Sequence, residues 1–174
     1  NGKLYTNNLP ASSTCCIRKW FTPENTANEY DGSLDFYVIR YAEVLLSLSE
    51  AMIEKGGYSQ AEITKYINEV RDRVGMPAVE EVEGTNLEQD ELRAIVRHER
   101  RVELAFEGHR LFDIRRWRIA EQVMNGEVYG ATPPGADDRY LAQTRVFNPN
   151  RDYLWPIPVG EMNTNTAMEQ NPGY

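Results

Sequence analysis

Residues 91–118 read ELRAIVRHERRVELAFEGHRLFDIRRWR, and this stretch decides how the chain folds. At the helical spacing of about 100° per residue, its apolar residues gather into one stripe made of Leu92, Ile95, Val96, Val102 and Phe106. Glu99 and Glu103 lie near the middle of that stripe. Because a carboxylate on a core-facing stripe is costly unless it is paired, we expect arginines from neighbouring elements to converge on both glutamates.

The glutamates Glu99, Glu103 and Glu107 recur once per helical turn, which places neighbouring carboxylates about 6 Å apart. Such a pair could supply the two acids of a glycoside hydrolase. Arginines surround them in this sequence, however, and a nearby guanidinium favours the ionised carboxylate, which spoils a general acid. We therefore interpret the ladder as a structural ion-pair network that ties helices together. The arginines expected to reach it from preceding elements are Arg40, Arg71 and Arg73.

Other catalytic and metal-binding motifs are incomplete. His98-Glu99 resembles the start of a zinc-protease helix, but that motif needs a second histidine one turn later, where this chain has Val102. The other histidine, His109, is too far along the chain to complete it. The sequence also lacks a nucleophile triad, a phosphate loop and a dinucleotide fingerprint. We predict a protein that is not an enzyme, with no catalytic residue, no metal site and no cofactor.

The segment that precedes this stretch predicts a helical hairpin. A helix expected over about residues 35–55 is stopped by Gly56-Gly57, and a second helix starts at Ser59. Ser59 and Glu62 form a capping-box pattern at that start. The hairpin is similar to one tetratricopeptide-like unit, which cannot bury both of its faces without neighbouring helices.

The remaining segments complete a mainly α fold of tetratricopeptide-like hairpins with irregular loops and an extended C-terminal tail. Residues 1–34 are irregular, and residues 77–90 form an acidic linker expected to be solvated, with Thr85 or Asn86 capping the next helix. Helices expected over about 87–106 and 109–125 make a second hairpin, so that residues 35–125 hold both. Residues 126–174 follow as a long loop or irregular hairpin and a tail.

The amino-acid composition further limits the partners and the class of protein that we expect. The formal net charge is −8, which argues against nucleic acid as a partner. The adjacent Cys15 and Cys16 are the only cysteines, so a disulfide framework is not expected. The chain has no apolar run long enough to span a membrane and no targeting signal, so we expect it to be soluble as it stands.

Three phrases together carry a family resemblance: YVIRYAEVLLSLSEA (37–51), ERRVELAFEGHRLFDIRRW (99–117) and YLWPIPVGEMNTN (153–165), the last followed by QNPGY (170–174). Their order and spacing resemble the C-terminal portion of the SusD/RagB family, the surface lipoproteins of Bacteroidetes that capture nutrients for a TonB-dependent transporter. Thr166 departs from the pattern, since many relatives have proline there.

The resemblance implies a function in glycan uptake. Such a protein binds oligo- or polysaccharides at the bacterial outer membrane, is anchored by a lipidated N-terminal cysteine that this chain lacks, and passes its ligand to a SusC-like transporter. The matched phrases imply scaffold and not ligand contacts. From chemistry alone, Trp20 and Tyr30 are the candidates for stacking on sugar rings. The alternative is a tetratricopeptide-like scaffold that contacts only proteins.

Overall fold

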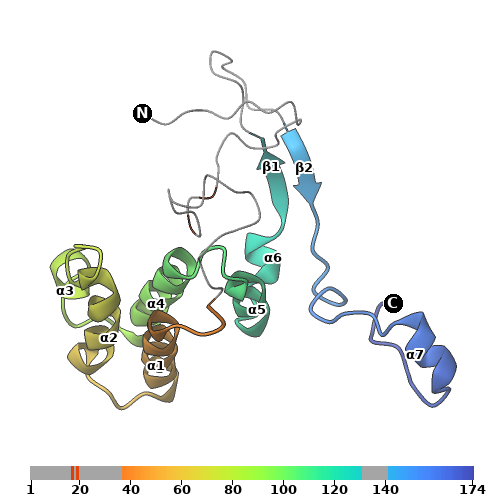
Figure 1. The fold of residues 1–174 in the computed structure, drawn as a ribbon, viewed down its shortest axis with the longest axis horizontal. Coiled ribbons are helices and arrows are strands. Elements are labelled where there is room, and N and C mark those ends of the chain that lie inside the picture. The colour runs from red at the N-terminus through yellow and green to blue at the C-terminus, as the bar shows by residue number, and fades with distance from the viewer. Residues whose placement is uncertain (1–16, 18, 20–36, 131–140) are drawn as a thin grey trace, which may run out of the picture. The chain divides into compact units, whose positions relative to one another are not determined.

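The computed structural model describes residues 17, 19, 37–130 and 141–174, and these fold mainly as helices with one two-stranded sheet, as predicted (Figure 1). The chain divides into two compact units. One unit is Thr22–Arg110, and the other combines Asn1–Phe21 with Leu111–Tyr174. Each unit has a hydrophobic core of its own.

The first unit contains the predicted first hairpin. Helices α1 (Tyr41–Lys55) and α2 (Gln60–Asp72) are joined by a short turn, and α4 (Gln89–Glu103) also packs against α1. Helix α1 ends at Gly56, whose φ of +71° is a conformation that favours glycine. Ser59 caps α2, and its capping box with Glu62 is formed as the sequence predicted.

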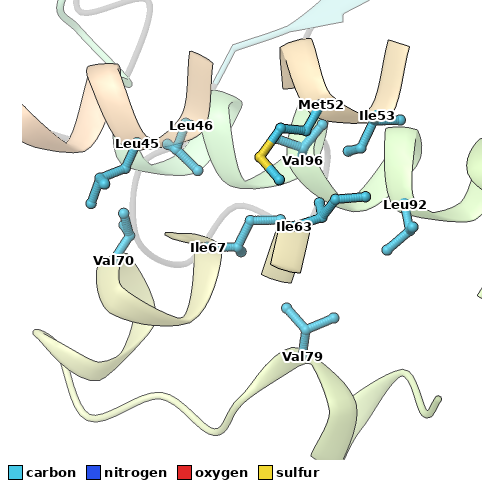
Figure 2. Close-up of a cluster of buried hydrophobic side chains, with 10 residues drawn as sticks. All are labelled: Leu45, Leu46, Met52, Ile53, Ile63, Ile67, Val70, Val79, Leu92 and Val96. Carbon is cyan, nitrogen blue, oxygen red and sulfur yellow. The ribbon is translucent and has the colours of Figure 1, made fainter. Parts of the chain in front are cut away.

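Apolar side chains from α1, α2 and α4 meet in the core of this unit (Figure 2). The buried members are Leu45, Leu46, Met52, Ile53, Ile63, Ile67, Val70, Val79, Leu92 and Val96. The predicted stripe of α4 is only partly buried, because Val102 and Phe106 are exposed. Phe106 lies beyond the end of α4 at Glu103, with a φ of +65°, outside the helical periodicity. Val102 is still within α4 but faces solvent.

The acidic linker is not the solvated loop that we predicted. It contains the short helix α3 (Val79–Val82), whose Val79 is fully buried in the core (Figure 2). Asn68 of α2 accepts a hydrogen bond from the Val79 N–H at 2.8 Å and donates to the Glu80 carboxylate at 2.8 Å. Thr64 also donates to Glu80. The buried Val79 and polar side chains of α2 therefore hold an otherwise acidic segment against the helices.

The N-terminus of α4 also differs from the prediction. Glu88 is the N-cap residue, and its N–H donates to the Glu91 carboxylate at 2.8 Å. Asn86 has a φ of +66°, which places it in the turn before the cap. An acidic residue in the first helical turn suits the partial positive charge of a helix N-terminus, so Glu88 and Glu91 can replace the expected cap at Thr85 or Asn86.

The helix predicted over residues 109–125 is interrupted. It forms α5 (His109–Arg116) and α6 (Ala120–Val123), with Arg118 between them at a φ of +55°. The Ile119 N–H bonds the Ile114 carbonyl at 3.2 Å, and the Arg118 N–H bonds the Arg115 carbonyl at 3.1 Å. This pair of bonds is the Schellman closure that ends helices, with arginine where glycine is usual.

The interruption serves the core of the second unit. It allows Ile114 and Ala120 to be buried together with Phe147. Strands β1 (Gly126–Tyr129) and β2 (Leu141–Arg145) pair antiparallel, with Gly126 opposite Arg145, so the irregular-hairpin alternative for this segment is the correct one. A further short helix that we did not predict, α7 (Val159–Thr164), lies in the tail.

Candidate functional site

The structure pairs Arg71 with Glu99, as the carboxylate spacing predicted. Arg71 Nε and Nη2 donate to the same Glu99 oxygen at 2.8 Å and 2.6 Å. The two side chains are only 7% and 8% exposed. The pair joins α2 to α4, and Arg71 also donates to the Pro77 carbonyl at 3.4 Å, which attaches the loop before α3.

Arg40, the residue before α1, binds both remaining glutamates of the ladder. It donates to the Glu103 carboxylate at 2.6 Å and, through two nitrogens, to both Glu107 oxygens at 2.7 Å and 2.8 Å. The hydrogen bonds to Glu107 are the main reason that the pKa of Arg40 is raised above its ordinary value. Arg73 at the end of α2 also donates to both Glu103 oxygens at 2.9 Å. Glu103 therefore links the start of α1 to the end of α2.

A further charged pair in this unit was not anticipated. The buried Arg100 lies 3.7 Å from the Glu50 carboxylate and donates to the Ser47 hydroxyl at 2.9 Å, which connects α4 to α1. The sequence signal was available, because Glu50 lies on the same helical face as the buried Leu46 and Ile53. Among the predicted residues, the contacts pair Glu99 with Arg71 and Glu103 with Arg40. The carboxylates that could have been catalytic are engaged by guanidinium groups, an arrangement suited to holding helices together.

An open groove of about 800 Å³ is lined by residues of α2 and by the residues that lead into and form α3. Its lining is acidic, with Glu69, Asp72 and Glu81 beside Lys65 and Met76. It presents no aromatic face on which a sugar ring could stack. Within the described part of the chain, no group of three or more histidine, cysteine or acidic side chains could hold a metal ion.

In the second unit, the C-terminal residues fold back onto the segment that follows β2. The Gln170 amide accepts from the Ile157 N–H at 2.7 Å and donates to the Ile157 carbonyl at 3.0 Å. Asn171 donates to the Trp155 carbonyl at 2.7 Å, and Tyr174 donates to the Leu154 carbonyl at 3.1 Å. We call residues 170–174, with these contacts to residues 154–157, the C-terminal clasp. These hydrogen bonds attach the predicted tail, although most of residues 165–174 stay exposed.

The clasp presents a tryptophan side chain to solvent. Trp155 is 65% exposed as a residue, and the guanidinium carbon of Arg115 lies 4.3 Å from the ring centroid. That distance is typical of a cation–π contact. Trp155 was not a predicted ligand contact, because it lies in the phrase YLWPIPVGEMNTN (153–165), which the family resemblance implies to be scaffold.

The other aromatic residues differ in whether the structure describes them and in how far they are exposed. Trp20 and Tyr30, the predicted sugar-stacking residues, lie outside the described residues. Phe147, another loop aromatic, is buried in the core of its unit and contacts the Tyr153 ring edge to face at 4.9 Å between centroids. Tyr129 of β1 is half exposed and donates to Glu127. Among the described aromatics of the second unit, Phe112 of α5 is 70% exposed and Trp155 is 65% exposed.

Comparison with known proteins agrees with the motifs. The protein-family model described as the SusD family (SusD_RagB) matches residues 6–174. SusD-like protein P2 of Formosa agariphila is 39% identical over 153 residues, which cover 84% of this chain and 27% of that protein. The crystal structure of a SusD-like protein from Bacteroides fragilis matches with a TM-score of 0.67 and 32% identity, covering 80% of this chain and 26% of that chain.

A second solved structure, a SusD homologue from Bacteroides thetaiotaomicron, matches with a TM-score of 0.58 and 29% identity, over 80% of this chain and 27% of that chain. The chain thus spans about a quarter of the length of these relatives. Since the family match extends over nearly the whole sequence and the helical fold agrees with it, the chain belongs to the SusD family.

Proposed function

We infer that the protein takes part in nutrient uptake by binding glycans, as an oligo- or polysaccharide receptor without catalytic activity. The observation that carries this proposal is the family match over residues 6–174, together with relatives that share 39% and 32% of the matched residues. The described part of the chain supplies a helical scaffold, in which Arg71–Glu99 and Arg40–Glu103 connect the helices. Ligand binding is then a task for loops and exposed aromatic side chains.

The cellular setting that fits this proposal is the outer surface of the bacterial outer membrane, with a lipid as the anchor. No helix among the described residues is long and apolar enough to cross a bilayer. The proposed partner is a SusC-like TonB-dependent transporter that receives the glycan. The net charge of −8 speaks against nucleic acid as a ligand.

Trp20 and Tyr30 remain our proposed ligand contacts in the segment before α1. Both residues have large amphipathic rings, and they stand among asparagine, threonine and proline residues, a composition typical of binding loops. Their separate replacement by alanine is expected to weaken glycan binding. Unchanged binding in both variants would remove them from the site.

Affinity electrophoresis tests the proposal. The 174-residue chain is run in native gels that contain an α-glucan, a β-glucan, a galactan or a uronic-acid polymer. We expect at least one of these polysaccharides to slow the chain and no reducing ends to be released from it. Unchanged mobility in all four gels, with the helical circular-dichroism spectrum intact, would count against the proposal. Release of reducing ends would point to a glycosidase.

A protein-interaction scaffold is the second candidate. Its support is a stripe of exposed apolar residues, Tyr41, Val44 and Leu48, on α1. These residues recur at helical spacing, and an apolar helix face in water is typical of a surface that another helix covers. Substitution of Val44 and Leu48 by lysine should leave polysaccharide retardation unchanged if the glycan proposal holds. If the chain serves only as a scaffold, no polysaccharide will slow it at all.

A further inference from the structure

Asn125 connects the two ends of the β-hairpin in the second unit. Helix α6 leads into β1 (Figure 1), and Asn125 comes directly before Gly126, the first residue of that strand. The Asn125 carboxamide nitrogen donates to the Glu121 carbonyl at 2.9 Å, and its oxygen accepts from the Phe147 N–H at 2.5 Å. The side chain therefore ties the chain that enters the hairpin to the chain that leaves it.

An asparagine that precedes a glycine can lose its side-chain nitrogen without an enzyme. The Gly126 backbone nitrogen attacks the Asn125 Cγ, so that a new N–Cγ bond forms and the Cγ–Nδ2 bond breaks with release of ammonia. Water then opens the resulting succinimide ring. Addition of water at Cγ leaves aspartate, whereas addition at the main-chain carbonyl carbon leaves isoaspartate. Glycine favours the attack because it has no side chain to hinder the approach of its nitrogen.

The folded structure holds the Asn125 carboxamide away from this reaction. Its bond to Glu121 turns the group back toward a residue four positions earlier, whereas attack requires Cγ to come within roughly 3 Å of the Gly126 nitrogen. The bond from Phe147 polarises the carbonyl, but it also opposes the rotation that attack needs. Phe147 is buried with Ile114 and Ala120, so its N–H is held in place by the core.

We propose that Asn125–Gly126 is a deamidation site that the closed fold of the second unit protects. Asn125 is exposed to solvent, so the two hydrogen bonds, and not burial, provide the protection. Either product undoes the connection. Aspartate has no N–H to donate to the Glu121 carbonyl, and isoaspartate adds one carbon to the main chain at the start of β1. Conversion therefore turns a transient opening of the hairpin into a lasting one.

Peptide mapping tests the protection. Cleavage after Arg118 and Arg139 releases residues 119–139, in which Asn125 is the only asparagine, and fragmentation of this peptide separates it from Gln122. At mildly alkaline pH, we expect the folded chain to convert at least about tenfold more slowly than the same chain in guanidinium chloride. In the denaturant, Gly126→Ala should slow the conversion. Equal rates in the folded and the unfolded chain, or no conversion in the denaturant, would overturn the proposal.

Hydrogen exchange of the Phe147 amide tests the consequence. Each product adds a negative charge, so ion exchange separates the converted chain from the unaltered one after refolding. The Phe147 amide should exchange faster in the converted chain, while the Val79 amide, bonded to Asn68 in the first unit, should keep its rate. If the converted chain does not refold, Asn125→Ala, which removes both bonds, is measured in its place. Unchanged exchange at Phe147 would show that Asn125 does not hold the hairpin and would overturn the proposal.

Discussion

The Arg71 guanidinium lies 2.6 Å from the Glu99 carboxylate, and both side chains are more than nine-tenths removed from solvent. The pair joins α2 to α4 across the core that these helices share with α1. Burial of two charges is costly, so each depends on the other and on its remaining hydrogen bonds. This relationship explains why a dense run of charged residues can occupy a helix that also carries the core.

Removal of one charge from this pair should destabilise the protein strongly. Glu99→Gln keeps the shape of the side chain but leaves Arg71 buried with no compensating charge at that position. We expect the free energy of unfolding to fall by about 3 kcal/mol or more, measured by urea denaturation. The control is Glu54→Gln, which weakens the more exposed contact with Arg93 and should cost less than about 1 kcal/mol.

The double variant Arg71→Met/Glu99→Leu refines this prediction. It removes both charges, so it should recover much of the stability lost in Glu99→Gln. Equal stability of Glu99→Gln and the unaltered chain would show that the pair is not an energetic link between the helices.

We expect the Glu80 carboxyl to contribute to the loss of folding stability in acid. Burial raises the pKa of its carboxyl, but hydrogen bonds donated by Thr64 and Asn68 outweigh burial, so the pKa lies below its ordinary value of 4.5. A carboxyl whose pKa is lower in the folded state than in the unfolded state stabilises the fold above the unfolded pKa. That stabilisation is lost as the pH falls below 4.5 through the folded pKa.

Denaturation curves measured between neutral pH and acid check this expectation. Glu80→Gln removes the titrating group while keeping a similar shape, so its stability should depend less steeply on pH in the acid range than that of the unaltered chain. The matched control is Glu81→Gln, at an exposed neighbouring position. Identical slopes for all three proteins would show that Glu80 makes no contribution.

Gly173, in the C-terminal clasp, occupies a position where only glycine fits. Gly173 has a φ of +89°, and a Cβ there would lie 2.9 Å from Arg151 Cβ. Gly173→Ala should therefore loosen the clasp and speed hydrogen exchange of the Ile157 amide, which is bonded by Gln170. Gly160→Ala, in helix α7 with open space around it, should leave that exchange rate unchanged. If Gly173→Ala does not alter exchange at Ile157, the clasp does not depend on this close approach.

The sequence predicted the parts of the fold that repeat. Periodicity located α1, α2 and α4, glycine placed the turn after α1, and the capping pattern located the start of α2. The placement of Glu99 on an apolar stripe was enough to anticipate a buried partner, and Arg71 lies on the facing helix.

The parts that were missed depend on contacts between segments without a period. Helix α3 is fixed by Asn68 and Thr64, and the clasp is fixed by Gln170 and Asn171, all through hydrogen bonds to residues more than ten positions away. The break at Arg118 has no glycine or proline to mark it, since tertiary burial of Ala120 outweighs the local cost of a left-handed arginine.

The central claim is that this SusD-family chain captures glycans and leaves them intact. Titration calorimetry with oligosaccharides prepared from the polysaccharide that slows the chain in gels tests it most directly, followed by chromatography of the recovered sugar. We predict saturable binding and oligosaccharides of unchanged length. Absence of binding heat at several temperatures from a folded protein, or recovery of shortened oligosaccharides, would contradict the account.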